Sequence, residues 1–234
     1  MFEGNLATVL ERVGDDALVL DVGGWGKPLR RADWVLDRMP YETRGLYGFD
    51  GEGPERFDAA TWVQRDMCDR EPWPFVDDQF DFAVCSHTLE DVRDPIGVCQ
   101  ELARVAKAGY LEVPSRLEEQ SFGVQGPWVG WGHHPWLVEL LPDGAGLEFT
   151  FKHHVLHGRS TDHFPAGFHA SLAPEEKVAW LFWEGGFEAR EQVFVEPAAL
   201  DGYLADFVAA ELERRGWSGA GGRRRRFGAR IRTG

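Results

Sequence analysis

The sequence predicts an α/β fold: a Rossmann-like, mostly parallel sheet with helices on both faces. Two observations predict it. Short apolar runs recur through the first half of the chain, and polar residues or a glycine-rich turn follow them. A helical pattern lies between the later runs, at 95–109, where Pro95 occupies a first-turn position and Gly109 closes the helix. Strands that alternate with loops or helices are typical of an open, parallel sheet.

Five strands are expected in the first half of the chain, and we place them at 17–22, 32–37, 62–65, 80–85 and 110–113. The first run, ALVLDV, enters a tight turn that contains Gly23, Gly24 and Gly26. In parallel sheets of this kind, ligands bind at the carboxyl ends of the strands. The polar residues that end these runs therefore predict a binding edge.

The second half differs in composition and is predicted to begin with a β-hairpin. The segments 136–140 and 147–157 flank LPDGAG, whose Asp-Gly pair favours a hairpin turn. We expect a helix over 173–183, because acids lie in its first turn and apolar residues follow at helical spacing. A late strand is expected at 187–196 and an amphipathic helix at 197–216.

These elements suggest four segments. Residues 1–120 form the binding core, 121–170 a cap excursion that contacts the acceptor, 171–216 the completion of the core, and 217–234 a basic flexible tail. The excursion holds most of the histidines and many glycines. Two of its tryptophans, Trp128 and Trp131, are flanked by glycines and are candidates for a lid, whereas Trp180 and Trp183 are expected in the core.

Composition narrows the class of partner. The 234 residues carry a net charge of −14, but residues 1–213 alone carry −22, because eight arginines and no acid follow Glu213. A body so acidic repels phosphate backbones, so nucleic acid is not expected as the partner. No apolar run is long enough to cross a bilayer. The three cysteines form no paired motif and the N-terminus lacks signal-peptide features, so the cytoplasm is the expected location.

Three segments then resemble a known family: VLDVGGWG, RDMCDREPWPFVDDQFDFAVCSHTLEDVRDP and ELARVAKAGYLEVPS. They are similar to the class I S-adenosylmethionine-dependent methyltransferases, over about residues 17–116. The resemblance implies a Rossmann-like fold, S-adenosylmethionine as cofactor and methyl transfer as the reaction. It implies cofactor-binding roles for eight residues: Asp21, Gly23, Gly24, Asp37, Asp66, Met67, Ser86 and His87.

Within the resemblance, Asp21 and the glycines pass under the methionine part of the cofactor. Asp37 would hydrogen-bond the ribose hydroxyls, and Asp66 would accept from the adenine amino group, with Met67 beside the ring. Ser86 and His87 would face the methyl-bearing sulfonium. The sequence departs from the family's glycine pattern, since Trp25 and Lys27 stand where glycines are expected. Asp50 is a rival for the ribose acid if the second strand is instead LYGF.

The acceptor side is assigned from composition alone. We expect His133, His134, His153 and His154 to include the catalytic base, because histidine exchanges a proton near neutral pH. The same histidines are also possible metal ligands, but no cysteine or carboxylate motif completes a set, so no metal is expected. The reaction expected is methyl transfer to an oxygen or nitrogen of a small-molecule acceptor (a specialised metabolite, sugar or peptide). The alternatives are another group transfer and a non-catalytic binding module; a homodimer formed through the hairpin is also left open.

Overall fold

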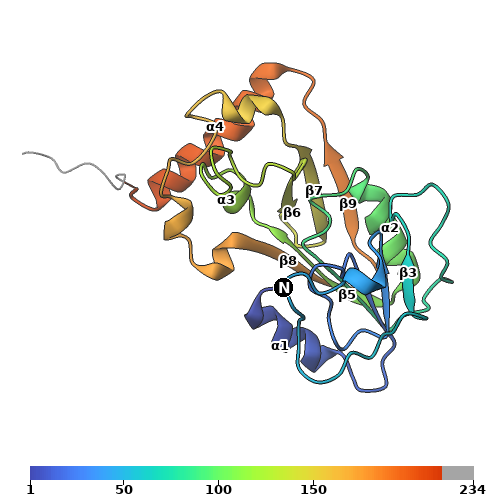
Figure 1. Cartoon of the computed structure of the whole chain (residues 1–234). Helices are drawn as coiled ribbons and strands as arrows, with labels where there is room; N and C mark the ends of the chain where they lie inside the picture. The colour runs from blue at the N-terminus through green and yellow to red at the C-terminus, as the bar shows by residue number, and fades with distance from the viewer. Residues whose placement is uncertain (218–234) are drawn as a thin grey trace, which may run out of the picture.

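The computed structural model describes residues 1–217, and it confirms the predicted α/β fold (Figure 1). Of the predicted basic tail, only Trp217 lies within the described residues. A six-stranded sheet has the order β3-β2-β1-β4-β5-β8, and its first five strands run parallel. These five are β1 (Val19–Val22), β2 (Trp34–Asp37), β3 (Trp62–Gln64), β4 (Phe82–Ser86) and β5 (Ala108–Pro114), and each overlaps a predicted strand.

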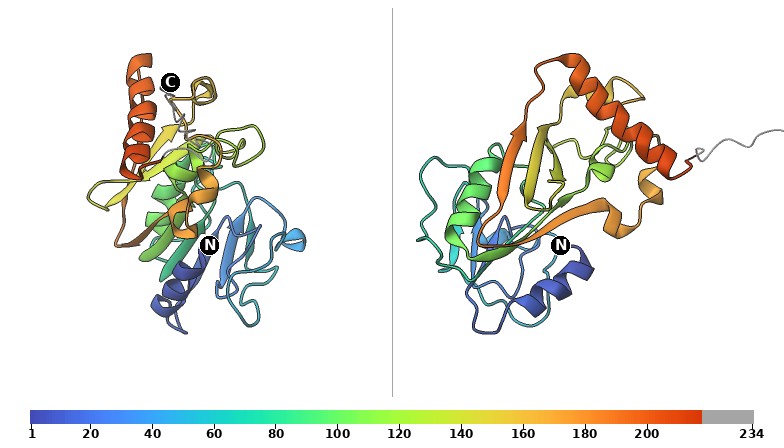
Figure 2. Two further views of the ribbon diagram at one scale, coloured as in Figure 1. Left: turned by 90° about the vertical axis from the view of Figure 1, so that its left-hand side faces the viewer. Right: turned by 180° about the vertical axis from the view of Figure 1, so that it is seen from behind.

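The two faces of this sheet are covered by different helices. Side chains alternate along β4, so that Ala83 and Cys85 face the cluster that includes α2 (Pro95–Val105). Phe82 and Val84 face the opposite cluster, which includes α1 (Glu3–Arg12). Because both faces are buried, most residues of these strands are apolar, which made them recognisable in the sequence. Figure 2 shows α1 and α2 on either side of the sheet.

The expected helix over 173–183 is wrong. Only a short 3₁₀ turn, η4 (Pro174–Lys177), forms there, and β8 (Val178–Glu184) follows it as an edge strand antiparallel to β5. Leu181 and Trp183 face one core cluster, while Trp180 and Phe182 face the other. A strand with both faces covered carries apolar residues at every position, and such a run also satisfies helical spacing.

The predicted hairpin is present, and it belongs to a second sheet of order β6-β7-β9. β6 (Trp136–Leu140) and β7 (Gly146–Phe151) are antiparallel, and β9 (Glu188–Gln192) runs parallel to β7. The range expected to complete the core is therefore divided, with β8 in the main sheet and β9 in the second. The remaining short elements are the helix α3 (Arg116–Glu119) and the 3₁₀ turns η1 (Tyr41–Thr43), η2 (His154–His157) and η3 (His169–Ser171).

The C-terminal helix α4 (Pro197–Arg214) packs on the cap rather than on the main sheet. Leu200 and Leu204 join a cluster with Val129, Leu137 and Leu156 of the excursion. The cap thus has its own small core beside the second sheet (Figure 2). None of the helices within residues 1–217 has the length and apolar character required to span a bilayer.

Candidate functional site

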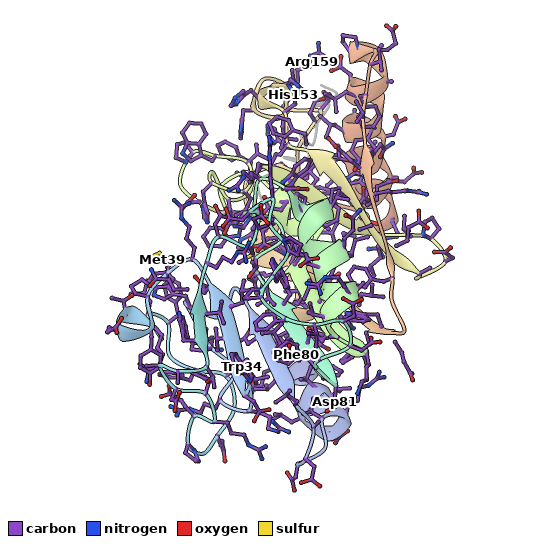
Figure 3. The ribbon with its side chains drawn as sticks, turned by 90° about the vertical axis from the view of Figure 1, so that its right-hand side faces the viewer. Trp34, Met39, Phe80, Asp81, His153 and Arg159 are labelled. Atoms are coloured by element: carbon purple, nitrogen blue, oxygen red, sulfur yellow. The ribbon has the colours of Figure 1, made fainter. Side chains whose placement is uncertain are left out.

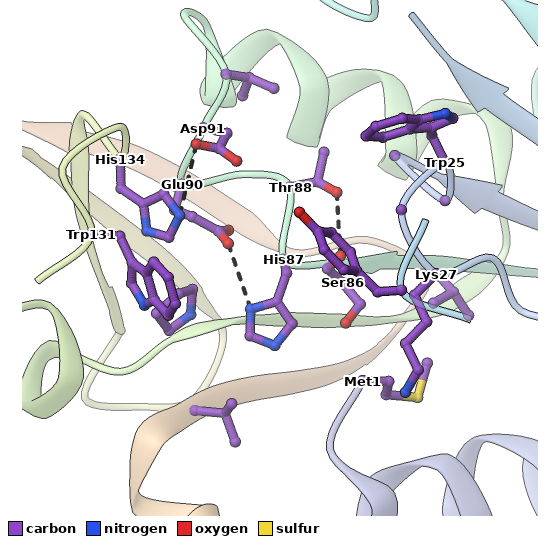
Figure 4. Close-up of a pocket in the computed structure, with 18 of the residues that line it drawn as sticks. Met1, Trp25, Lys27, Ser86, His87, Thr88, Glu90, Asp91, Trp131 and His134 are labelled. Atoms are coloured by element: carbon purple, nitrogen blue, oxygen red, sulfur yellow. Dashed lines mark hydrogen bonds and ion pairs between the residues drawn. The ribbon is translucent and has the colours of Figure 1, made fainter. Parts of the chain in front are cut away.

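A cavity of about 850 Å³ lies at the carboxyl edge of the parallel strands, where ligands bind in such sheets. At one end it is lined by the turn after β1 and by the ends of β2 and β4. At the other end it is lined by residues of the cap excursion. Figure 4 shows the two ends meeting around His87.

The turn after β1 needs its glycines. Gly23 has a φ of +77°, and a Cβ there would lie 2.1 Å from Oγ1 of Thr88. A Cβ on Gly24 would lie 2.4 Å from Oδ2 of Asp21. Both positions therefore exclude larger residues, and both line the cavity. Backbone is thus exposed to a ligand at this end of the cavity.

Asp21 supports this turn from inside. Its Oδ2 accepts a hydrogen bond of 2.8 Å from the backbone N–H of Leu29, which fastens the far end of the loop to the strand. Burial raises the pKa of Asp21 to about 7, although the Leu29 hydrogen bond acts against that rise. Asp21 is therefore partly protonated at neutral pH, and its carboxyl group lines the cavity.

Asp37 lies at the end of β2, as the sequence predicts, and the alternative strand LYGF does not form. Its Oδ2 accepts from the Trp25 N–H at 3.0 Å, and its Oδ1 accepts from the Met39 N–H at 2.8 Å. Burial raises the pKa of Asp37, and those backbone hydrogen bonds oppose the rise. Asp50 also lines the cavity, but its carboxylate lies 2.5 Å from Nζ of Lys27. Within residues 1–217, Asp50 thus forms an ion pair and Asp37 forms none.

Ser86 and His87 end β4 and line the middle of the cavity. His87 adopts a φ of +54°, a conformation that a residue other than glycine holds only when its surroundings enforce it. Its Nε2 lies 3.1 Å from Oε1 of Glu112, and its Nδ1 lies 3.6 Å from Oε1 of Glu90. Burial alone would lower the pKa of His87, but the hydrogen bonds and charges of these two carboxylates raise it to about 9.

Glu112 is fully buried on the face of β5 that α1 covers. Its carboxylate accepts from the backbone N–H of Phe2 at 2.9 and 3.0 Å, at the N-terminus of α1, and from the hydroxyl of Tyr110. Burial would raise its pKa, but His87, Tyr110 and the Phe2 N–H together lower it to about 2. A helix N-terminus also favours a negative charge. Sequence analysis missed Glu112, because nothing in YLEV distinguishes it from an outward-facing acid.

Asp66 lies outside the cavity, unlike the other residues that the resemblance assigns to cofactor binding. Its carboxylate lies 2.6 Å from the Arg93 guanidinium and accepts from the Cys68 N–H at 2.9 Å. The Arg93 hydrogen bond lowers the pKa of Asp66 below its usual range. Asp66 does not line the cavity, whereas Met67 does. Asp66 therefore stays a predicted adenine contact that the cavity lining does not include.

The cap brings His133 and His134 to the other end of the cavity, beside Trp131. His134 is buried, and its Nδ1 lies 2.6 Å from Oε1 of Glu119. Lys152 is also buried and donates to Oε2 of Glu119 at 2.7 Å. This contact fixes the ring of His134 and leaves its Nε2 directed toward Asp91, at 3.7 Å from Oδ1 (Figure 4).

His153 and His154 lie elsewhere. They follow β7, are exposed, and are absent from the cavity lining. Figure 3 shows His153 and Arg159 at the end of the molecule remote from Trp34 and Phe80 of the main core. The side chain of the preceding residue, Lys152, turns inward to Glu119, so the chain presents the next residues to solvent. Of the four histidines proposed for catalysis, the structure brings only His133 and His134 to the cavity.

The tryptophans also divide. Trp131 lines the cavity, whereas Trp128 lies outside the lining and its ring packs edge-on against His157 at 5.5 Å. Trp180 is partly buried and Trp183 buried in the core clusters of the main sheet, as expected, although on a strand. Of the two lid candidates, only Trp131 is positioned to cover a ligand.

Several cavity residues were not foreseen. Glu90 and Asp91 follow β4 within LEDVRD, and Glu118 and Gln125 come from the segment after β5. Glu90 is 1 % exposed, and its Oε2 has no hydrogen-bond partner within residues 1–217. An acid-rich loop directly after the fourth strand was the available signal for Glu90 and Asp91. Sequence alone did not place that loop beside residues more than forty positions later.

Comparison with known proteins identifies the family. A family model described as a methyltransferase domain matches residues 3–192. The chain therefore belongs to this family of methyltransferase domains, which confirms the resemblance to the S-adenosylmethionine-dependent enzymes and S-adenosylmethionine as their cofactor. No curated protein sequence matches the chain.

Among solved structures, the chain is similar to a putative methyltransferase from Bacillus halodurans, with 21% identity and a TM-score of 0.36, over 48% of this chain and 52% of that one. It is also similar to an S-adenosylmethionine-dependent methyltransferase from Mesorhizobium loti, with 17% identity and a TM-score of 0.35, over 50% and 56% of the two chains. These alignments span about half the length of each solved chain.

Proposed function

We propose that the protein transfers a methyl group from S-adenosylmethionine to an oxygen or nitrogen of a small molecule. One observation carries the proposal. Residues expected to bind the cofactor, such as Gly23, Asp37 and Ser86, line the same cavity as His133 and His134 from the cap. Cofactor and acceptor would thus occupy neighbouring ends of one cavity, which is the arrangement that a direct transfer requires.

The residues at the first end suit this cofactor. The turn at Gly23 and Gly24 exposes backbone to the cavity. The carboxylate of Asp37, which forms no ion pair within residues 1–217, suits a ribose diol, and Met67 offers an apolar contact for the adenine. When bound, the cofactor supplies an electrophilic methyl group on a sulfonium cation. The lining favours a cation electrostatically, because its acidic residues (Asp21, Asp37, Asp50, Glu90, Asp91 and Glu118) outnumber its cationic side chains (Lys27, Lys177 and protonated His87).

The second end supplies a base. If His134 donates its Nδ1 hydrogen to Glu119, its Nε2 carries a lone pair toward the cavity and can accept a proton from the acceptor. His133, which is more exposed, is the other candidate. His87 does not suit this role, because a pKa of about 9 keeps it protonated at neutral pH. Trp131 would cover the acceptor and exclude water.

The experiment is a turnover assay. Purified protein is incubated with S-adenosylmethionine and a library of small hydroxyl and amine acceptors, and release of S-adenosylhomocysteine is measured. The proposal expects acceptor-dependent release of S-adenosylhomocysteine and a product heavier by one methylene unit. Cofactor binding without release for any acceptor would instead support a binding module. Consumption of the cofactor without S-adenosylhomocysteine would support another group transfer.

A further inference from the structure

Three side chains at the acceptor end of the cavity have the composition of a metal site. They are Asp91, which follows β4, and His133 and His134 of the cap excursion. One ligand atom from each lies within 4.8 Å of the others. The Nε2 atoms of His133 and His134 lie 3.8 and 3.7 Å from Oδ1 of Asp91. We propose that these three residues bind a divalent transition-metal ion such as Zn²⁺.

The three ligand atoms are available. Within residues 1–217, neither the Asp91 carboxylate nor the His133 ring takes part in a hydrogen bond, and His134 uses only its Nδ1. At tetrahedral zinc, ligand atoms about 2.1 Å from the ion lie about 3.4 Å apart, so a small rotation of each side chain would close the set. Two imidazoles and a carboxylate suit zinc, iron or manganese better than calcium or magnesium, which prefer oxygen ligands.

Two further features support the site. Glu119 holds Nδ1 of His134 at 2.6 Å, and a carboxylate on the far nitrogen is the usual partner of a metal-binding histidine. Glu90, next to Asp91, lines the same cavity with a buried oxygen atom that lacks a hydrogen-bond partner within the described chain. A bound cation would contact that oxygen of Glu90, or a water molecule on the cation would donate a hydrogen bond to it.

Three protein ligands leave at least one coordination position open toward the cavity. An acceptor hydroxyl bound there would lose its proton to solvent more readily, because a divalent ion stabilises the oxyanion. In the ion-bound state the Nε2 atoms of His133 and His134 are ligands, so the ion replaces the histidine base in activating the acceptor. This use of the ion rests on the proposed methyl transfer, whereas ion binding itself does not. The site therefore deepens the proposed function by favouring an acceptor with an oxygen donor.

The ion is tested directly, in protein without tag, cofactor or acceptor. Co²⁺ is titrated into metal-free protein, its visible absorption is followed, and Zn²⁺ is then added as competitor. We expect one Co²⁺ per chain, with the intense visible bands of a low-coordinate site, displaced by one equivalent of Zn²⁺. Asp91→Asn and His133→Ala should each weaken binding by more than about tenfold, since even changes outside the ligand set cost 10- to 100-fold.

The sequence supplies a matched control. His153 and His154 are also adjacent histidines, but they lie outside the cavity, so the His153→Ala/His154→Ala double variant should bind Co²⁺ as the parent protein does. His133 is 55 % exposed, so its replacement should leave the melting temperature unchanged and report on binding alone. Absence of Co²⁺ bands in the parent protein, or their loss in the control variant, would overturn the site. Because no acceptor is present, either result is independent of whether methyl transfer occurs.

Discussion

Nε2 of His87 lies 3.1 Å from Oε1 of Glu112, which joins the floor of the cavity to the N-terminus of α1. Glu112 is fully buried, and its other hydrogen-bond donors include the Phe2 N–H, the Tyr110 hydroxyl and the Ser86 hydroxyl. A buried carboxylate is stable only when such partners replace water. The protonated imidazole of His87 is one of them, so the charge of a cavity residue and the packing of a distant helix depend on each other.

This pair predicts a pH dependence of stability. The folded-state pKa of His87, about 9, lies above its ordinary value of 6.5, so the folded protein holds an extra proton between these values. The contribution of His87 is therefore complete below about pH 6.5 and is lost as the pH rises through about 9. We expect the stability difference between the parent protein and His87→Asn to shrink over that window. Urea unfolding at a series of pH values measures it, and a difference independent of pH would refute the ion pair.

Cofactor binding predicts a thermal shift. A ligand that binds only the native state adds about 2.7 kcal/mol at a free concentration of one hundred times its Kd. In a domain of this size that corresponds to a rise in melting temperature of about 5–10 °C. We expect S-adenosylmethionine and S-adenosylhomocysteine both to produce such a rise. Differential scanning fluorimetry measures it, with ATP as an adenine-containing control. No shift and no calorimetric heat at millimolar cofactor would contradict cofactor binding.

The two candidate ribose acids predict different affinities. Asp37→Ala should weaken cofactor binding by about 1–3 kcal/mol, the scale of a lost hydrogen bond to a charged group. Asp50→Ala should reduce the free energy of cofactor binding much less, because the Asp50 carboxylate is already ion-paired with Lys27. Isothermal titration calorimetry measures both affinities. Asp37 also holds the N–H groups of Trp25 and Met39, so Asp37→Asn serves as a second variant that keeps one acceptor oxygen. The reverse order of effects would move the ribose contact to Asp50.

The cap histidines predict a division of function by position. Alanine at His133 or His134 should lower turnover by about 10²–10⁴, the usual contribution of general-base catalysis, while cofactor affinity is retained. The loss is expected whether the histidines take the acceptor proton themselves or hold the ion that activates the acceptor. Alanine at His153 or His154 should leave turnover unchanged, because these residues do not line the cavity. The assay is S-adenosylhomocysteine release with an accepted substrate. If all four variants turn over normally and one changes the oligomeric state in light scattering, the hairpin is an interface and the acceptor pocket lies elsewhere.

The main sheet was predictable because its signal is local. Each of the first five strands is a short apolar run, and a parallel strand buried on both faces shows that run directly in the sequence. The strand β8 shows where this local signal fails. Its first six residues are apolar and lie on both faces, and only the pairing with β5 decides between strand and helix. That pairing is a long-range contact, so it overrides the local helical spacing.

The cofactor end of the site was likewise predictable from residues at strand ends, whereas the acceptor end was not. Asp91 is an ordinary acid in LEDVRD until the cap places His133 and His134 beside it. Glu119 is equally ordinary in SRLEEQ, and its importance comes from contacts with His134 and Lys152. Groups of residues such as these come together only when the two sheets pack, and the spacing of residues in the sequence does not indicate that packing. Histidine pairs therefore look alike in sequence, although His133–His134 lines the cavity and His153–His154 does not.

The buried pair of Glu119 and Lys152 predicts a stability loss centred on the cap. Their side chains are 1 % and 4 % exposed and lie 2.7 Å apart, and the only other hydrogen bond of the Lys152 ammonium within the described residues is to the Trp131 carbonyl. Glu119→Gln would leave a buried ammonium without its counter-charge, so we expect a loss of about 3–5 kcal/mol in the free energy of unfolding. Lys152→Met added to Glu119→Gln should recover part of that loss, because it removes the stranded charge. Urea denaturation measures both losses.

The surface pair of Arg190 and Glu148, at 2.8 Å, is the matched control. Arg190→Met should lower the free energy of unfolding by less than about 1 kcal/mol, because solvent screens exposed ion pairs. Equal losses at the two sites would mean that the Glu119 pair is open to water, and the cap would then be too loosely held to keep His134 at the cavity.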